Sequence, residues 1–420
     1  MTFLRGVTCA LVLVACGDDD RPMDRDADVG RDAAVDSAVD AAARDSAADA
    51  ALDATDAGVD AGEMCPRLPA PADRVRRVVI SHPFATDGAP AEVFEVLELS
   101  QDGTLSRPDT TFTMGRATQT PIAFTPDGEV GAVAQDDGSL GVFRLNDDGS
   151  VEVMHASYDG AFFATAVVPA LDGTGFWIRD AQFRASGGGI YFVEIGCDGA
   201  IASERMAFPA KLPYGFLPRA DGSAVVFARD VLDVMDPPED AFLVTLDTPM
   251  RTAQADVFDD DDWIGSSSTL TANGRHALIA DNSIASTNRV GVVSLGGGAI
   301  APVQVISPFE DPAAVVASPF DDAAIVLSAF GNAIFRLSYN PDAALPFVNE
   351  GELTYMGGRP ALPSAAALVD RGTLSGLVVI AENVSVRQVR FMGGGAVTDL
   401  GAFGLGDDSA NIVGTIGVQP

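Results

Sequence analysis

The strongest constraint on the fold is a strand-and-turn unit that recurs about every 49 residues through most of the chain. Its clearest copy is the sequence PIAFTPDG at residues 121–128, followed by apolar strands at 130–134 and 140–145. Matching turns recur at Asp172-Gly173, Asp221-Gly222, Asn273-Gly274, Asp321-Asp322 and Arg371-Gly372. A unit of this length, with Asp-Gly turns between β-branched strands, is typical of a four-stranded propeller blade.

An earlier unit at residues 77–103 brings the number of blades to seven. This first unit lacks an inner strand, whereas the chain ends with a spare strand at 412–418. We predict that 412–418 completes blade 1, because closing the ring removes exposed strand edges. The predicted fold is all-β, a seven-bladed β-propeller over residues 64–420. A pair of β-sandwiches or a β-helix is the alternative for repeats this degenerate.

Two segments resemble the lactonase-like (YVTN/WD40-like) seven-bladed propellers, namely FEVLELSQDGTL at 94–105 and IAFTPDG at 122–128. The resemblance covers most of residues 75–418 and implies the fold, whereas propellers carry many unrelated activities. The group includes a phosphogluconolactonase, whose anionic sugar lactone would require His and Arg in the central channel. The segments that enter the blades of this chain carry no histidine, so Arg359 is the one candidate catalytic residue.

Residues 1–15 have the features of a secretory signal peptide, with Arg5 followed by an apolar stretch that is too short to span a bilayer. Residues 13–16, LVAC, resemble the lipobox of bacterial lipoproteins, which implies cleavage before Cys16 and lipid attachment to its thiol. Gly17 follows the cysteine, and in that class this implies the outer membrane rather than the inner membrane. An ordinary cleaved signal with an incidental cysteine is the alternative.

Residues 16–63 are predicted to form a disordered tether between the lipid and the propeller. Residues 18–63 contain 15 acidic and 4 basic side chains and no aromatic residue, so they cannot form a core. The whole chain has 60 acidic and 26 basic residues and a formal net charge of -34. This charge excludes nucleic acid as a partner and argues against an anionic substrate.

Few residues are candidates for metal binding. The three histidines, His82, His155 and His276, lack the spacing of a zinc site. An acidic run that precedes Trp263 has the oxygen ligands that calcium prefers, and a solvated run is the alternative; it consists of Asp259, Asp260, Asp261 and Asp262. No other cofactor is predicted.

The cysteines leave one candidate disulfide. Cys9 belongs to the predicted signal and Cys16 to the predicted lipid attachment, so Cys65 and Cys197 remain. An oxidising compartment beyond the inner membrane favours a bridge between them. Two separate thiols are the alternative, because nothing in the sequence sets their separation.

Two functions remain open at this stage. The first is a monomeric, lipid-anchored propeller of the cell envelope that acts as a scaffold or binds a protein or glycan. The second is a periplasmic or surface lactonase-like hydrolase that uses Arg359 and carboxylates in the channel. Ionisable groups meeting at the channel mouth would distinguish the hydrolase from the binding module.

Overall fold

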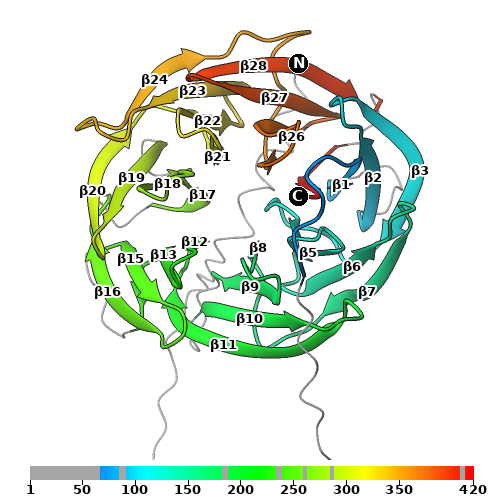
Figure 1. The fold of residues 1–420 in the computed structure, drawn as a ribbon, viewed down its shortest axis with the longest axis horizontal. Coiled ribbons are helices and arrows are strands. Elements are labelled where there is room, and N and C mark those ends of the chain that lie inside the picture. The colour runs from blue at the N-terminus through cyan, green and yellow to red at the C-terminus, as the bar shows by residue number, and fades with distance from the viewer. Residues whose placement is uncertain are drawn as a thin grey trace, which may run out of the picture. The chain divides into compact units, whose positions relative to one another are not determined.

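The computed structural model describes residues 67–84, 91–181, 188–232, 239–258, 263–283, 288–406 and 412–420. Contacts divide the chain into two units, 1–58 and 59–420, and the described residues all belong to the second. They form seven antiparallel sheets arranged as a ring (Figure 1). None of them belongs to a helix with the length and hydropathy needed to cross a bilayer. The predicted all-β, seven-bladed architecture is confirmed.

The strands of each blade are given from the innermost outwards. Blade 1 contains β29 (Thr415–Val418), β1 (Arg76–Ser81), β2 (Val93–Leu99) and β3 (Leu105–Thr113). Blade 2 contains β4 (Ala123–Phe124), β5 (Val130–Ala134), β6 (Leu140–Leu145) and β7 (Val151–Tyr158). Blade 3 contains β8 (Ala166–Pro169), β9 (Gly175–Asp180), β10 (Gly189–Ile195), β11 (Ile201–Lys211) and β14 (Asp230–Val231). Blade 4 contains β12 (Gly215–Pro218), β13 (Ser223–Phe227), β15 (Ala241–Thr245) and β16 (Met250–Ala255).

The remaining three blades have the same order. Blade 5 contains β17 (Gly265–Leu270), β18 (His276–Asp281), β19 (Arg289–Gly296) and β20 (Ala299–Ile306). Blade 6 contains β21 (Pro312–Ala317), β22 (Ala323–Ser328), β23 (Ala333–Tyr339) and β24 (Phe347–Glu352). Blade 7 contains β25 (Ala366–Val369), β26 (Leu377–Glu382), β27 (Ser385–Gly393) and β28 (Ala396–Gly404).

The last strand of the chain closes the ring, as predicted. β29 pairs antiparallel with β1, with Val78 opposite Val418 and Ser81 opposite Thr415. Figure 1 shows the C-terminus beside β1, on the inner side of blade 1. The side chain of Ile416 is fully buried in a cluster that joins blade 1 to blade 7. Closure therefore fills the inner position of blade 1 and packs it against its neighbour.

The core consists of seven hydrophobic clusters, each of which joins two adjacent blades. In β1, Val78 and Ile80 pack with residues of blade 7, whereas Val79 packs with residues of blade 2. Successive side chains of a strand point to opposite faces of its sheet, and both faces are buried in a propeller. The middle strands are therefore almost wholly apolar rather than alternating.

One strand departs from the predicted pattern of four. β14 lies between β13 and β15 in the sequence, yet it pairs with β11 of the preceding blade, with Ala210 opposite Val231. Blade 3 therefore has five strands, and the fifth comes from a connection within blade 4. This exchange ties blades 3 and 4 together by main-chain hydrogen bonds as well as by packing.

Candidate functional site: a hydroxyl-lined cavity in the channel

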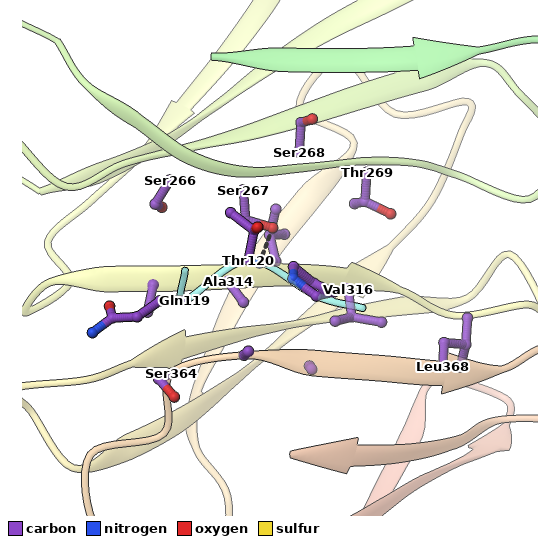
Figure 2. A pocket seen from close by; sticks show the side chains of 15 residues that line it. Gln119, Thr120, Ser266, Ser267, Ser268, Thr269, Ala314, Val316, Ser364 and Leu368 are labelled. Atoms are coloured by element: carbon purple, nitrogen blue, oxygen red, sulfur yellow. Dashed lines mark hydrogen bonds between the residues drawn. The ribbon is translucent and has the colours of Figure 1, made fainter. Parts of the chain in front are cut away.

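The inner strands of blades 5, 6 and 7, together with residues 119–121, line a cavity of about 220 Å³ (Figure 2). An inner strand pairs with its own blade along one edge only, so its other main-chain edge faces the channel. The cavity is smaller than the 300 Å³ or so that begins the usual range for drug-sized ligands. It has room for a molecule of about the size of one monosaccharide.

The polar side chains of the cavity are neutral. They are Gln119, Thr120, the Ser-Ser-Ser-Thr run at 266–269 and Ser364, and the remaining lining residues are Pro, Ala, Val and Leu. Of the described residues that line the cavity, none is acidic, basic or a histidine. General acid and base catalysis needs such a group, and a serine nucleophile needs an adjacent base. The described lining is therefore suited to hydrogen bonding.

Two of the serines hold neighbouring blades together, and a third has a buried hydroxyl without a partner. Ser266 Oγ donates to the main-chain oxygen of Pro312 at 2.6 Å, and Ser267 Oγ accepts from the main-chain nitrogen of Val315 at 3.3 Å. These bonds join β17 to β21. The buried hydroxyl of Ser364 has no hydrogen-bond partner among the described residues. Buried polar atoms without a partner are rare, and a bound molecule would satisfy this one.

Arg359, the candidate catalytic residue, does not line this cavity. Its guanidinium forms an ion pair with Glu352, the last residue of the outer strand β24, at 2.8 Å between Nη2 and Oε2. The same nitrogen donates to the main-chain oxygen of Gly331 at 3.4 Å. The side chain is 58% exposed. The structure thus brings Arg359 to an outer strand of blade 6 and not to other candidate catalytic groups.

The three histidines belong to three different blades. His82 follows β1 and lies 3.4 Å from the carboxylate of Glu95, His155 belongs to β7, and His276 begins β18. Within the described residues, no group of three His, Cys, Asp or Glu side chains is placed to hold a metal ion.

Several predicted site residues lie outside the described residues, namely Cys16, Cys65, Asp259, Asp260, Asp261 and Asp262. Cys197 is disulfide-bonded. Arg67, two residues after Cys65, donates from Nη2 to the main-chain oxygen of Gly196 at 2.9 Å. The chain therefore passes beside Cys197 shortly after Cys65, which is consistent with a bridge between these two cysteines, and the bridge stays a prediction.

The chain is similar in structure to proteins from several bacteria. The Pseudomonas aeruginosa periplasmic gluconolactonase PpgL superposes with a TM-score of 0.61 at 14% identity, over 83% of this chain and 99% of that one. The structural neighbours are lactonase-like. A putative 6-phosphogluconolactonase from Bacteroides uniformis gives 0.60 at 11% identity, over 82% and 99% of the two chains. A Lactobacillus plantarum protein gives 0.60 at 10% identity, over 83% and 100%.

No protein-family model matches the chain, and no curated protein matches its sequence. Structural likeness at these identities shows the fold alone. The chain is therefore a seven-bladed β-propeller with lactonase-like neighbours, and its activity has to be argued from its own residues.

The serine run at 266–268 has no base nearby in the sequence, so no motif marks it as a site. Its position on the innermost strand of blade 5 is what makes it part of a cavity. The strand register predicts that position, whereas the contributions of Gln119 and Ser364 depend on how closely blades 2, 5, 6 and 7 approach the axis. No local sequence signal carries that information.

Proposed function

We propose that the protein is a binding module of the cell envelope whose channel cavity takes a small, neutral, polyhydroxylated molecule, such as the terminal sugar of a glycan. The observation that carries this proposal is the cavity lining, which combines hydroxyl, amide and main-chain groups, with no ionisable side chain among the described residues. Hydroxyl groups both donate and accept hydrogen bonds, as do the hydroxyls of a sugar. The Ala, Val and Leu side chains complement the C–H faces of a sugar ring.

Weak binding follows from the same lining. No aromatic side chain is present among the described lining residues, so a sugar ring has no face to stack on. We expect dissociation constants near the millimolar range for a single sugar. Useful affinity in the envelope would then come from a ligand held at high local concentration.

A titration of the full chain with glucose, N-acetylglucosamine and gluconolactone, followed by saturation-transfer NMR, tests the proposal. The decisive variant is Ser364→Ala, which removes a buried hydroxyl that has no protein partner. Loss of one hydrogen bond to a ligand is worth about 1 kcal/mol, so affinity should fall about fivefold. Thermal stability should not fall, because the variant leaves no protein group unsatisfied.

The matched control is Ser203→Ala on the outer strand β11, where the exposed hydroxyl donates to Glu194 Oε2 at 2.8 Å. This variant should bind as the wild type does. Equal affinity in the wild type and in Ser364→Ala, or binding of none of the three compounds, would contradict the proposal.

A lactonase-like hydrolase is the second candidate, and the likeness to the periplasmic gluconolactonase favours it. The same gluconolactone, followed for ring opening, separates the two functions. The binding module leaves the lactone opening at its spontaneous rate at every protein concentration. A rate that rises in proportion to the protein would support the hydrolase and would require a catalytic group beyond the neutral lining.

Location in the envelope rests on the LVAC sequence at residues 13–16, and a periplasmic structural neighbour supports it. Attachment of lipid to Cys16 would hold the protein at a membrane, with the outer membrane favoured by Gly17. The variant Cys16→Ser should move the protein from the membrane fraction to the soluble fraction. Retention of Cys16→Ser in the membrane fraction would contradict lipid anchoring.

A further inference from the structure

The segment 67–76, which precedes and begins β1, crosses the turns that connect the first two strands of several blades. The main-chain nitrogen of Ala70 donates to Pro126 O in blade 2 at 3.2 Å. The carboxylate of Asp73 accepts from the main-chain nitrogen of Thr373 in blade 7 at 2.8 Å. These contacts place two arginines of the segment, Arg74 and Arg76, beside a third that lies 295 residues further along, Arg371.

These three residues, named here the arginine cluster, donate hydrogen bonds to main-chain oxygens only. Arg74 Nη2 donates to Asp127 O at 3.2 Å and to Pro420 O at 3.3 Å. Arg76 Nη2 donates to Ala72 O at 2.7 Å and to Arg371 O at 3.1 Å. Arg371 Nη2 donates to Pro126 O at 2.7 Å. Within the part of the chain that the structure describes, none of the three forms an ion pair with a carboxylate. This is unexpected in a chain with 60 acidic and 26 basic residues.

Several nitrogens of the arginine cluster are buried without any partner. They are Arg76 Nε and Nη1, Arg74 Nε and Arg371 Nε, and the Arg76 side chain is fully buried. A guanidinium cannot lose its proton in a protein, so it stays charged there. A buried charge without a counter-ion is costly unless another group pairs with it.

The three charges also lie close enough to act on one another. Burial is the largest cause that lowers the pKa of Arg76, and the positive charges of Arg74 and Arg371 lower it further, while Asp370 and Asp73 oppose the shift. The pKa of Arg74 is lowered by burial and then by Arg371, while Asp127, Asp147 and Glu129 oppose the shift. Asp127 itself is paired with Arg67, with 3.0 Å between Oδ2 and Nη1.

We propose that the arginine cluster is a binding site for a phosphate-type oxyanion. Guanidinium groups pair well with the oxygens of phosphate, often through two parallel hydrogen bonds. Two of the arginines come from the segment 67–76 and the third from blade 7. Several neighbouring guanidiniums suit a tetrahedral dianion better than a planar carboxylate, which one arginine already satisfies. The free N–H groups supply the donors, and the anion neutralises the mutual repulsion of the three charges.

The site is separate from the cavity in the channel, because the two share no residue. Burial of Arg76 restricts the ligand to a small group, such as inorganic phosphate or the phosphate of a monoester. The two sources share one chemistry, and titrations with inorganic phosphate and with glycerol phosphate distinguish them.

The experiment is a thermal-unfolding titration of the full chain, dialysed free of phosphate, with phosphate and with sodium chloride at equal ionic strength. We expect phosphate to raise the unfolding midpoint saturably by several degrees beyond chloride, since a ligand bound to the folded state stabilises it. Arg371→Gln, at a half-buried turn position, should weaken phosphate binding at least tenfold in calorimetric titration.

The matched control is Arg275→Gln, which changes an exposed turn arginine that is paired with Asp342 at 2.8 Å between Nη1 and Oδ1. This variant should bind phosphate as the wild type does. Circular dichroism of both variants checks that the fold is retained, and Arg76→Gln provides a second site variant if Arg371→Gln unfolds. Equal shifts with phosphate and chloride would overturn the proposal, as would equal phosphate affinity in the wild type and in either cluster variant. If phosphate and chloride shift the unfolding midpoint equally, main-chain oxygens and nearby aspartates already suffice to neutralise the arginines.

Discussion

The channel cavity and the arginine cluster differ in the charge of their side chains. The cavity is lined by neutral hydroxyl and amide groups, whereas the arginine cluster holds three positive charges without a carboxylate partner among the described residues. A neutral lining selects ligands by the pattern of their hydrogen bonds, and an unpaired cationic cluster selects them by charge. The net charge of -34 for the whole chain therefore predicts the local charge of neither site.

A third region shows how the same protein buries charge when it supplies the partners. Arg387 in blade 7 is almost fully buried, and it pairs with both Glu382 and Asp399, the latter at 2.8 Å between Nη1 and Oδ2. This network needs no ligand. Arg76 is equally buried but lacks such partners.

The largest expected effect separates these two buried arginines. Arg387→Met should lower the free energy of unfolding by about 3–5 kcal/mol, because it leaves two buried carboxylates without a cation. Arg76→Met, in phosphate-free buffer, should cost less than Arg387→Met, because it removes a charge that repels two others, although it also removes the hydrogen bonds to Ala72 O and Arg371 O. Urea denaturation of both variants measures the difference. Similar losses would contradict the claim that Arg76 lacks a carboxylate partner.

A smaller effect on stability is expected at Asp240, a buried carboxyl group that can become neutral by keeping a proton. Burial raises its pKa to about 7, although it accepts hydrogen bonds from the main-chain nitrogens of Val257 and Phe258. An arginine cannot become neutral by a change of protonation, since it does not release its proton. Asp240 therefore keeps a proton in the folded state that the unfolded state gives up above about pH 4.

The sign of the pH dependence follows from this raised pKa. The stability that Asp240 contributes is complete below its unfolded pKa and is lost as the pH rises through about 7. Between pH 5 and 8, the wild type should lose about 2–3 kcal/mol more than Asp240→Asn does. Denaturation curves at several pH values test this, and parallel profiles for the two proteins would show that Asp240 titrates normally.

The smallest expected effect lies in the cavity. Because the lining residues that the structure describes include no ionisable side chain, the affinity for a neutral sugar should change less than twofold between pH 5 and 8. Saturation-transfer titrations at the two pH values measure this in the folded protein. A change in affinity of tenfold or more would place an ionisable group at the cavity and would support the hydrolase function.

Much of the fold follows from the repeat itself. The Asp-Gly turns and the apolar strands predict seven blades, and the spare strand at 412–418 predicts ring closure, because these are consequences of local pattern and of strand pairing. The fifth strand of blade 3 escaped prediction, since Asp230 and Val231 form too short a strand to give a periodic signal.

The two sites were less accessible to sequence reasoning. Arg371 meets Arg74 and Arg76 only because the ring closes, which brings the first and last blades together across almost the whole chain. Arg359 was singled out by its place before Pro360, but its guanidinium is long enough to pair with Glu352 on an outer strand. Which partner a long side chain reaches depends on packing, and the periodicity of the sequence does not predict packing.

The most direct test of the account is a crystal structure of the protein grown with both phosphate and a monosaccharide. We predict a phosphate bound by Arg74, Arg76 and Arg371, and a sugar in the cavity within hydrogen-bond distance of Ser364 Oγ. An empty arginine cluster together with an anion in the cavity would contradict it, because the separation of a neutral site from a cationic one would then be wrong.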